Sequence, residues 1–502
     1  MSRWTPEQEA VFDSLSSTTE HIVCEAVAGS GKTTTSVEAA KRSRVTDVGF
    51  VAFNKHIAAE LPGRLNGKAR ACTLHSLGFR AVKRAWPSIK MDERKLEKLL
   101  LNHYRPVKPL WFSAGKGRVR FGKEAQAVLK LTRLCKYTLT AGADWRELDA
   151  LADHHDVEIT DRTGIFDAAC KLLALSQEDT TTLDFDDMVW LPVVHRLAID
   201  RFKLLFVDES QDLNRCQHAL TQQASERFCY VGDSQQAIYG FTGADSESMN
   251  RLRKDLSPCL NRPLTVTFRC PVSHVALAQQ IVPHIQARDD APDGVVSRID
   301  PAQLYREVMP GDLVICRCNA PLLDAAYKLL AANVPVLVRG RDIGQGLIDL
   351  LLSMRASDTT DLVTKLKGYV DREQARLEAL ESPASKIQSL EDRVESLAIL
   401  CSRFDAIEPL IQSIKDMFQD TTDDGKVVLS SVHRAKGLEA DRVIILAPEK
   451  LPLVRKDQRD WELVQEHNLA YVAVTRAKQE LIFAGDIPEI FGNVSCDPLL
   501  WR

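Results

Sequence analysis

Short apolar runs alternate with longer amphipathic stretches along most of this chain. The runs lie at 21–26 ("HIVCEA"), 48–55 ("VGFVAFNK"), 201–212, 227–241, 264–271, 312–320, 426–437 and 441–448, and the first of them is β-branched as well as apolar. Such runs are typical of buried strands, and the stretches between them favour helices. Strand–helix alternation predicts parallel sheets covered on both faces. Because the strands cluster before and after about residue 262, we expect two α/β domains.

Two intervals, 86–181 and 345–424, interrupt this alternation and have a helical pattern. Each is interpreted as a mainly helical insertion into one α/β domain. The expected first domain then comprises 1–85 and 182–262, and the second 263–344 and 425–502. In the second interval Ile387, Leu390, Val394, Leu397 and Cys401 recur at three- and four-residue steps, which predicts one apolar helix stripe. This stripe could be the core of a helical hairpin or a docking face for a partner protein.

Composition places the chain among ordinary globular proteins. It has 502 residues, 45% of them hydrophobic and 27% charged, with a net charge of −4. No apolar run approaches the roughly 20 residues that span a bilayer, and the N-terminus lacks an apolar signal core, so we expect a cytoplasmic protein without membrane contact. The twelve cysteines form no CxxC pair, which argues against zinc or iron–sulfur and favours reduced, mostly buried thiols.

The stretch "EAVAGSGKTTT" (25–35) has the form of a phosphate-binding loop. It joins a predicted strand to a predicted helix, and glycines let backbone N–H groups approach an anion at a helix N-terminus. Lys32 would reach the β- and γ-phosphates, and the Thr33 hydroxyl would bind Mg²⁺. Ala26 stands where the usual pattern has its first glycine. The sequence therefore predicts a nucleoside triphosphate site.

A second acidic motif follows the apolar strand in "RFKLLFVDESQD" (201–212). Asp208 at the strand tip could hold Mg²⁺ through water, and Glu209 could orient and deprotonate the attacking water. A kinase would not need a water-activating acid at this place. Hydrolysis of the triphosphate is therefore favoured over its transfer to another substrate.

Further motifs, in order, resemble those of the UvrD/Rep-type helicases of superfamily 1. They are "TPEQEAV", "AVAGSGKT", "AFNK", "TLHSLGFR", "LDFDDM", "VDESQD", "VGDSQQAIYGF", "LTVTFRCP", "SSVHRAKGLEADRVII" and "QEHNLAYVAVTRAK". The resemblance runs from Gln8 to Lys478 and implies two RecA-like motor domains with a nucleotide cleft between them. Its implied activity is an ATP-dependent DNA helicase or translocase of 3′→5′ polarity, acting as a monomer on single strands and on junctions with duplex, with a replication or repair partner.

The resemblance also implies the residues of the ATP site. Gln8 would contact adenine, Phe268 would stack on it, and Glu439 would contact the ribose. Gln236 would sense the γ-phosphate, and Arg269 and Arg476 would act as arginine fingers. Phosphate and magnesium contacts would come from the loop residues Ala28, Gly29, Ser30, Gly31, Lys32, Thr33 and Thr34, together with Asp208.

The same family positions imply a path for single-stranded DNA. Aromatic stacking on bases is sequence-tolerant, so little base specificity is expected. The candidate DNA contacts are Asn54, Lys55, His75, Ser76, Tyr239, Phe241, Arg317, Asn319 and His433. The second interval is much shorter than the corresponding family domain, which motivates an alternative activity as a translocase that strips proteins and unwinds weakly. A nucleotide-gated DNA-binding module is a third possibility.

A basic, aromatic segment at 104–123 suggests a DNA-contacting arm, with a solvated loop as the alternative. We expect joint replacement of Lys116, Arg118 and Arg120 by alanine to weaken DNA binding. Because each lost phosphate contact on a single strand reduces the salt slope by roughly 0.7, the slope should flatten by up to about 2. Fluorescence anisotropy over a salt series measures it, and an unchanged slope would count against the arm.

Overall fold

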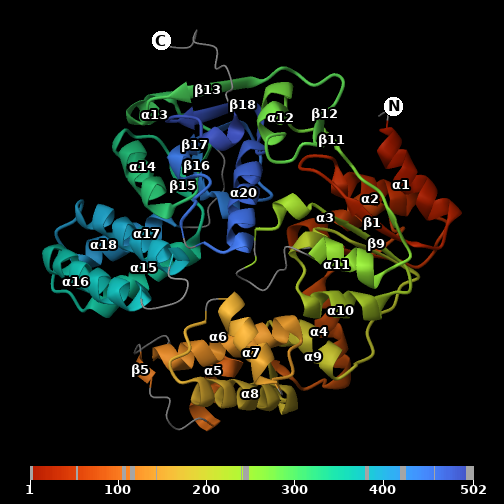
Figure 1. Ribbon diagram of the computed structural model, residues 1–502, viewed down its shortest axis with the longest axis horizontal. Coiled ribbons are helices and arrows are strands. Elements are labelled where there is room, and N and C mark those ends of the chain that lie inside the picture. Colours follow the sequence, from red (N-terminus) through yellow and green to blue (C-terminus); the bar gives the residue numbers. More distant parts are fainter. Residues whose placement is uncertain are drawn as a thin grey trace. The chain divides into compact units, whose positions relative to one another are not determined.

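The computed structural model describes residues 4–52, 55–103, 109–112, 119–142, 144–155, 157–238, 240, 248–378, 384–418, 425–456 and 458–492. The chain forms two compact units (Figure 1). The first comprises Met1–Ala26 and Gly31–Leu264, and the second comprises Val27–Ser30 and Thr265–Arg502.

A six-stranded parallel sheet forms the centre of the first unit. Its strand order is β10-β1-β9-β8-β2-β3, and every neighbouring pair is parallel. The strands are β1 (His21–Glu25), β2 (Val48–Ala52), β3 (Arg70–Thr73), β8 (Leu204–Val207), β9 (Phe228–Gly232) and β10 (Cys259–Asn261). The predicted parallel α/β fold is confirmed.

Helices cover both faces of this sheet because successive strand residues point in opposite directions. Ile22 and Phe50 pack toward one face, while their neighbours Val23 and Val51 pack toward the other. The first face is covered by α1 (Pro6–Ser17), α2 (Lys32–Arg42) and α3 (Lys55–Leu65). The other is covered by α4 (Leu74–Ala85), α9 (Asp187–Val194), α10 (Arg215–Ala224) and α11 (Ser248–Asp255).

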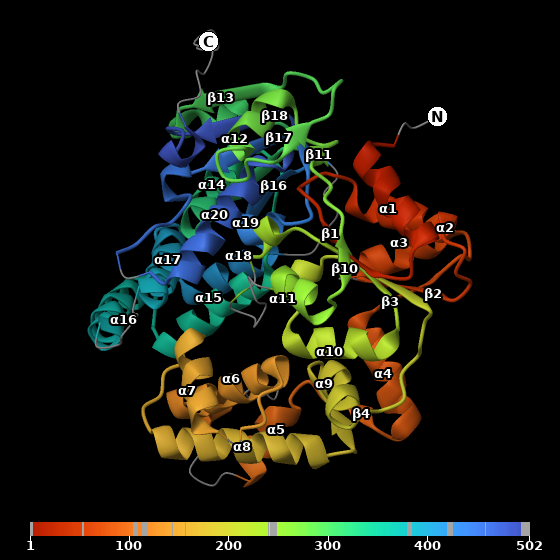
Figure 2. The ribbon, with the colours of Figure 1, turned by 45° about the vertical axis from the view of Figure 1, so that its right-hand side comes forward.

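A mainly helical layer extends the apolar core that lies between the sheet and the helices α4, α9, α10 and α11 (Figure 2). It consists of α5 (Lys95–His103), α6 (Lys123–Thr138), α7 (Trp145–His154) and α8 (Arg162–Glu178), with the short pairs β4 (Lys90–Met91) with β7 (Thr182–Leu183) and β5 (Pro109–Phe112) with β6 (Val119–Phe121). Leu131, Leu148 and Phe166 from this layer belong to the same apolar cluster as Leu77 and Leu220. The layer is therefore anchored to the first sheet by a continuous core.

The second unit repeats the parallel design. Its sheet has the order β13-β18-β17-β14-β16-β15, with all pairs parallel. The strands are β13 (Val295–Ile299), β14 (Leu313–Cys316), β15 (Val336–Val338), β16 (Val427–Ser431), β17 (Ala440–Leu446) and β18 (Ala477–Ala484). The accompanying helices are α12 (Val272–Ala278), α13 (Leu304–Glu307), α14 (Asn319–Ala331), α19 (Val432–Ala435) and α20 (Asp460–Val474).

Four further helices share a core with this second sheet. They are α15 (Arg341–Met354), α16 (Thr359–Glu378), α17 (Ala384–Cys401) and α18 (Ile407–Met417). The predicted helix stripe is confirmed in α17, where Leu397 and Cys401 are buried in the cluster and Val394 packs against it. This part of the stripe serves as core and is not available to a partner.

The run 264–271 forms a shorter strand than predicted, and this strand lies outside the two six-stranded sheets. β11 (Val266–Thr267) pairs with β12 (Gln286–Ala287) in a separate sheet, and Leu264 makes an isolated parallel bridge with Ala26, the residue after β1. The Thr267 hydroxyl accepts hydrogen bonds from the backbone N–H groups of Arg269 and Cys270, at 3.3 and 3.4 Å. Such a side-chain turn competes with strand pairing and ends the strand early.

Two further expectations from the sequence concern the state of the cysteines and the presence of membrane-spanning helices. Among the described residues the cysteines are unpaired thiols, most of them buried. No helix in the described part of the chain is long and apolar enough to cross a bilayer.

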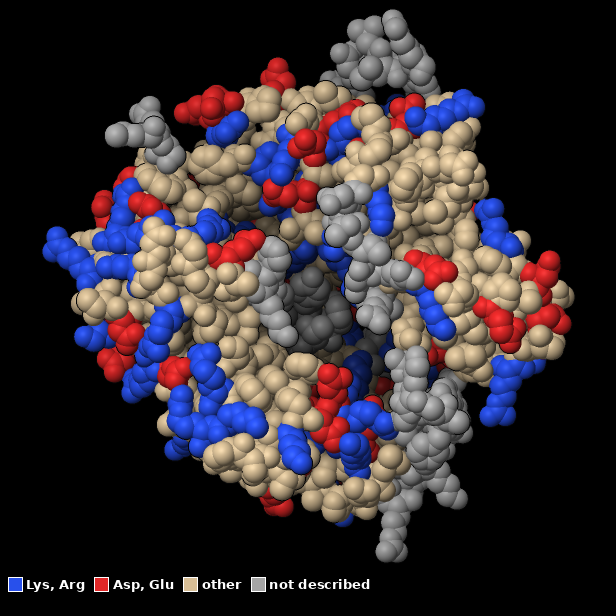
Figure 3. Space-filling model, turned by 180° about the vertical axis from the view of Figure 1, so that it is seen from behind, with Lys and Arg blue, Asp and Glu red and all other residues tan. Residues whose placement is uncertain are grey.

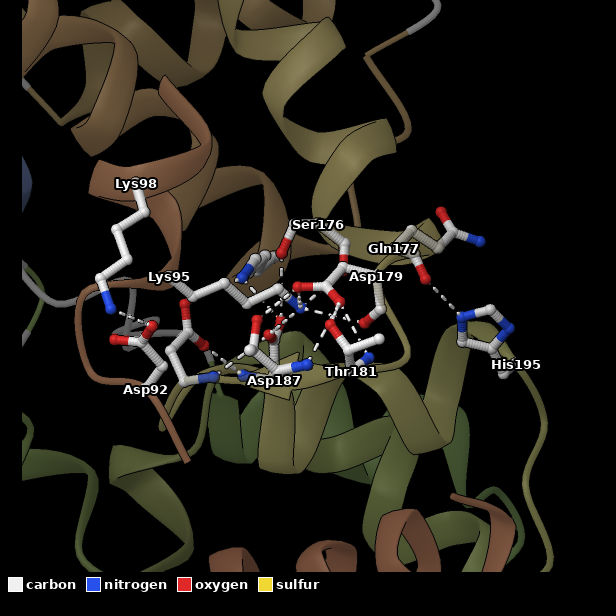
Figure 4. A network of polar contacts seen from close by, with 12 residues as sticks. Asp92, Lys95, Lys98, Ser176, Gln177, Asp179, Thr181, Asp187 and His195 are labelled. Carbon is white, nitrogen blue, oxygen red and sulfur yellow. Dashed lines mark hydrogen bonds and ion pairs between the residues drawn. The ribbon is translucent and has the colours of Figure 1, made fainter. Parts of the chain in front are cut away.

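Buried charged residues connect α5 and α6 of the helical layer to α9, the helix that precedes β8. Asp187 is fully buried and accepts hydrogen bonds from Lys95 Nζ and Lys136 Nζ, each at 2.7 Å (Figure 4). Lys95 also donates to the Ser176 carbonyl at 2.9 Å, and Lys136 Nζ lies 3.3 Å from an Asp184 carboxylate oxygen. Burial by itself lowers the pKa of Lys136, but the charges of Asp187 and Asp184 outweigh it and raise that pKa, so the ammonium group stays charged.

Removing one partner of this network should destabilise the first unit strongly. In Lys136→Met the side chain keeps its approximate length, but Asp184 and Asp187 lose a fully buried counter-charge. Breaking a buried pair costs about 3–5 kcal/mol because the remaining charge stays desolvated. Urea unfolding followed by tryptophan fluorescence measures the loss of free energy of unfolding.

Lys98→Met is the matched control. Lys98 pairs with Asp92 at 2.6 Å at the edge of the same layer, but its side chain is 56% exposed. We expect this substitution to cost about 1 kcal/mol or less, since exposed pairs are screened by solvent. Equal losses in the two variants would show that burial of the Lys136 charge does not matter.

Candidate functional site: a phosphate-binding edge and an arginine cluster

The loop between β1 and α2 has the backbone of a phosphate cradle. Gly29 and Gly31 have φ values of 72° and 77°, which L-residues with side chains rarely adopt. Gly31 caps α2 without a side-chain hydrogen bond. A Cβ atom on Gly29 would lie 2.6 Å from both Thr267 Oγ1 and Arg269 Cβ. Both glycines are therefore required for the loop to keep this shape.

The hydroxyl of Ser30 supports an anion site in this loop. Ser30 is 1% exposed, and its Oγ has no hydrogen-bond partner among the described residues. An unsatisfied buried hydroxyl is costly, and a phosphate oxygen would complete it. Thr34, the last loop candidate, accepts a hydrogen bond from Arg64 at 3.0 Å on the exposed side of α2.

Lys32 stands at the start of α2 beside two oxygen atoms. Its Nζ donates to the Ala26 carbonyl at 3.3 Å and lies 3.9 Å from Asp233 Oδ2. Asp233 was not among the sequence candidates. It follows β9, is 3% exposed, and also accepts a hydrogen bond from Gln236 Nε2 at 2.6 Å. Burial raises the pKa of Asp233, and the charge of Lys32 opposes that rise.

The two predicted magnesium ligands meet directly. Thr33 Oγ1 donates to Asp208 Oδ2 at 2.8 Å, across 175 positions of sequence. Burial raises the pKa of Asp208 to about 6, the neighbouring Glu209 adds to the rise, and the Thr33 hydrogen bond opposes it. Described residues contain no cluster of three or more His, Cys, Asp or Glu that could hold a metal. A single carboxylate with a hydroxyl suits Mg²⁺, which keeps several waters and uses substrate phosphates.

Glu209 follows Asp208 at the end of β8, in a left-handed conformation with φ of 51°. Its carboxylate accepts a hydrogen bond from Gln211 Nε2 at 2.5 Å. Gln236, the predicted γ-phosphate sensor, lies in the short helix Ser234–Gln236 after β9 and is 5% exposed. The residues predicted from the first motifs therefore gather at the carboxyl ends of three neighbouring strands.

Gln8 is close to this edge but is already hydrogen-bonded. Its Nε2 donates to Thr35 Oγ1 at 2.9 Å, and its Oε1 accepts from the Thr5 N–H at 3.0 Å in a capping box of α1. A Cβ on Gly31 would lie 3.7 Å from Gln8 Nε2. The structure thus places Gln8 beside the loop, and adenine contact stays a prediction.

The back-half candidates form a second cluster, within the second unit. Arg269 donates to Glu439 Oε2 at 2.7 Å and to the Thr475 carbonyl at 3.3 Å. Arg476 is 1% exposed and donates to Thr475 Oγ1 at 3.1 Å and to the Val472 carbonyl at 2.9 Å. Burial raises the pKa of Glu439, but hydrogen bonds and charges from Lys478 and Arg269 outweigh it and lower that pKa.

Loop residues 27–30 pack with this cluster in the second unit. The Gly29 carbonyl accepts a hydrogen bond from the Phe268 N–H at 2.9 Å, and the Ala28 N–H donates to the Tyr471 hydroxyl at 2.8 Å. Phe268 itself is 40% exposed, so its ring surface is open to a ligand. Tyr471 was missed in the sequence, although it lies inside "QEHNLAYVAVTRAK", five residues before Arg476.

The DNA candidates divide into described and undescribed residues. His75 is exposed in the first turn of α4, and Ser76 accepts a hydrogen bond from Arg80 at 3.0 Å. Asn54, Tyr239 and Phe241 lie outside the described residues, as do Lys116 and Arg118 of the proposed arm, and for Lys55 only the backbone is described.

Two of the DNA candidates in the second unit donate hydrogen bonds to acidic side chains. Arg317 Nε donates to both carboxylate oxygens of Glu466 at 3.0 and 2.9 Å, and Asn319 Nδ2 donates to Asp392 Oδ2 at 2.8 Å. Burial lowers the pKa of His433 to about 3, and the charges of Arg317 and Arg434 add to the shift. His433 is therefore neutral at physiological pH.

Charges of both signs share the face of the molecule that Figure 3 shows. Figure 3 shows Lys and Arg interspersed with Asp and Glu over the displayed face, in keeping with the net charge of −4. Any attraction for a polyanion must come from local groups.

Comparisons with known proteins give the following matches. The family described as UvrD/REP helicase N-terminal domain matches residues 4–257, and the UvrD-like helicase C-terminal domain matches residues 345–485. F-box DNA helicase protein 1 of Schizosaccharomyces pombe is 23% identical over 530 residues, covering 97% of this chain and 58% of that protein. ATP-dependent DNA helicase PcrA of Bacillus subtilis is 23% identical over 448 residues, covering 63% of this chain and 60% of that protein.

The chain thus spans between 58% and 60% of the length of these two curated relatives. Among solved structures, Arterivirus nonstructural protein 10 (helicase) matches with a TM-score of 0.36 and 11% identity, covering 97% of this chain and 63% of that one. That likeness is too low to add to the fold described above.

Gly29→Ala should damage the phosphate loop more than its backbone strain alone predicts. The added methyl group would meet Thr267 and Arg269, whereas a methyl group on Gly67, which has φ of 73°, would meet nothing within 4 Å. Left-handed strain costs roughly 1–2 kcal/mol in both variants. We expect ATP binding to weaken at least about tenfold in Gly29→Ala, which corresponds to roughly 1.4 kcal/mol.

Gly67→Ala is the control. Its ATP affinity should stay within about twofold of the parent, because Gly67 follows α3 and lies outside the phosphate-binding loop. Titration with a fluorescent ATP analogue measures both variants. Equal affinities in the two would mean that the close approach at Gly29 has no bearing on nucleotide binding.

Proposed function

Because the chain belongs to the UvrD/REP helicase family, we propose that it is a DNA-dependent ATP hydrolase that moves along single-stranded DNA and unwinds duplex. The observation that carries the proposal is the direct contact of Thr33 with Asp208, beside Lys32 and Asp233. These groups combine a cation for phosphate, an oxygen pair suited to Mg²⁺ and an adjacent carboxylate.

The proposed chemistry assigns a task to each side chain at this edge. Mg²⁺, when bound, would neutralise charge on the β- and γ-phosphates of ATP. Lys32 and the loop N–H groups would bind phosphate oxygens, and Thr33 and Asp208 would hold the metal. Glu209 accepts the proton of the attacking water, and Gln236 contacts the γ-phosphate. Arg269 and Arg476 would stabilise charge on the transferred phosphoryl group, which would link hydrolysis to movement of the second motor domain.

The DNA part of the proposal rests on family membership and on the named relatives. The PcrA relative and the F-box relative are both named as DNA helicases. We propose 3′→5′ movement of a monomer on single strands and junctions. ATPase activity with and without single-stranded DNA, followed by unwinding of substrates with 3′ or 5′ tails, tests activity and polarity separately.

A translocase that removes bound proteins and unwinds weakly is the alternative. Its ground is the short helical interval at 345–424, whose helices α15–α18 share a core with the second sheet. Rapid movement on single strands with little strand displacement would favour this alternative. Absence of any DNA stimulation of the ATPase would favour the nucleotide-gated binding module instead.

Glu209→Gln tests the assigned base. We expect this variant to bind ATP and DNA like the parent but to hydrolyse ATP at least about a hundredfold more slowly, because a general base contributes on that order. Glu226→Gln is the control, since the Glu226 side chain is 83% exposed and forms a surface pair with Arg201. Near-normal turnover in Glu209→Gln, measured by phosphate release, would refute the assignment.

A further inference from the structure

Gln211 connects the acid after β8 to the loop after β9, and no motif-based expectation gave it a role. Its side chain is 1% exposed. Nε2 donates to Glu209 Oε2 at 2.5 Å, and Oε1 accepts the backbone N–H of Asp233 at 3.0 Å. A longer contact of 3.4 Å joins Nε2 to Asp212 Oδ2. The amide thus bridges two segments that both carry residues of the proposed ATP site.

The orientation of this amide is determined by its partners. A backbone N–H can only donate, so the Gln211 oxygen must face Asp233. The Nε2 group then has to face Glu209, whose carboxylate can only accept when ionised. A hydrogen bond to a charged group is stronger than one between neutral groups, so the carboxylate is held in one rotamer.

Packing leaves Gln211 little freedom to move independently of β9. A Cβ on Gly232, the last residue of β9, would lie 2.7 Å from Gln211 Oε1 and 3.0 Å from Gln211 N. Glycine therefore lets the motif around Gln211 approach the strand end. A further hydrogen bond holds the turn that leads from β8 to Gln211, since Ser210 Oγ donates to the Val207 carbonyl at 2.8 Å.

Asp233 extends this connection to the phosphate-binding groups. Its carboxylate accepts from Gln236 Nε2 at 2.6 Å and lies 3.9 Å from Lys32 Nζ. A shift of the loop after β9 would therefore move the Asp233 N–H, and with it the Gln211 amide. Glu209 would follow because its carboxylate is bonded to that amide.

We propose that Gln211 is a positioning residue that holds Glu209 in its hydrolytic orientation and makes that orientation depend on the loop Asp233–Gln236. This inference rests on the proposed function, since it takes Glu209 as the base for ATP hydrolysis. Gln211 itself touches no reacting atom in this scheme. It keeps the Glu209 carboxylate in its hydrolytic orientation as long as the loop Asp233–Gln236 holds the observed conformation.

Two substitutions at Gln211 distinguish its hydrogen bond to Glu209 from its hydrogen bond to Asp233. Gln211→Met removes both hydrogen bonds at similar length, and Gln211→Glu keeps an acceptor for Asp233 but loses the donor to Glu209. With saturating single-stranded DNA we expect kcat to fall roughly 10- to 100-fold in both, as for small misplacements of catalytic groups. The KM for ATP should stay within about twofold, because an unchanged KM with lower kcat indicates loss of interactions made in the transition state.

Gln222→Met is the matched control, because Gln222 is exposed on the neighbouring helix α10. Its kcat and melting temperature should equal those of the parent. If Gln211→Met fails to fold, Gln211→Glu, which retains the bond to β9, carries the same comparison. A kcat within about threefold of the parent in a folded Gln211 variant would overturn the proposal.

A double-mutant comparison excludes a merely structural effect. In the Glu209→Gln background, Gln211→Met should change the residual rate by less than about threefold, because residues that act as a unit are not additive. Equal losses in both backgrounds would overturn the positioning role. Near-normal turnover of Glu209→Gln alone would instead contradict the proposed function, so the two failures are distinguishable.

Discussion

Parallel pairing of β8, β9 and β1 is the constraint on which the proposed ATP site depends. Val207 lies opposite Tyr230, and Glu25 lies opposite Gly232, so the three strands end at the same edge of the sheet. The loops that follow them must therefore emerge side by side. Because of this pairing, groups that are far apart in the sequence come within hydrogen-bond distance of one another, as Thr33 and Asp208 do.

The second unit uses a single backbone segment to gather its charged groups. The carbonyl of Thr475 accepts from Arg269, while its hydroxyl accepts from Arg476. Glu439 then bonds Arg269 from the start of β17. Two guanidinium groups are held close together because neutral and acidic acceptors surround them, which offsets their mutual repulsion.

Sequence patterns predicted the inner strands of both sheets better than the edge strands. β14 and β16 lie within their predicted runs, and so do β1, β2, β8 and β9, while β17 begins one residue before its run. The edge strands β3, β10, β13 and β15 lay outside the predicted runs because they are short or partly exposed. The inner strand β18 was missed as well, because its first half is polar. The run at 264–271 gives only the two-residue strand β11, since the hydroxyl of Thr267 satisfies backbone donors that a longer strand would have paired.

The sequence by itself determined the fold class, the family and the chemical character of the candidate site, because these follow from strand periodicity and from motifs within a few residues of one another. Tertiary structure alone decided which of those groups touch. Asp233 beside Lys32, Gln211 between Glu209 and β9, and the buried pair of Lys95 with Asp187 all join residues from separate elements. Such contacts depend on strand order and helix packing, which local sequence patterns do not specify.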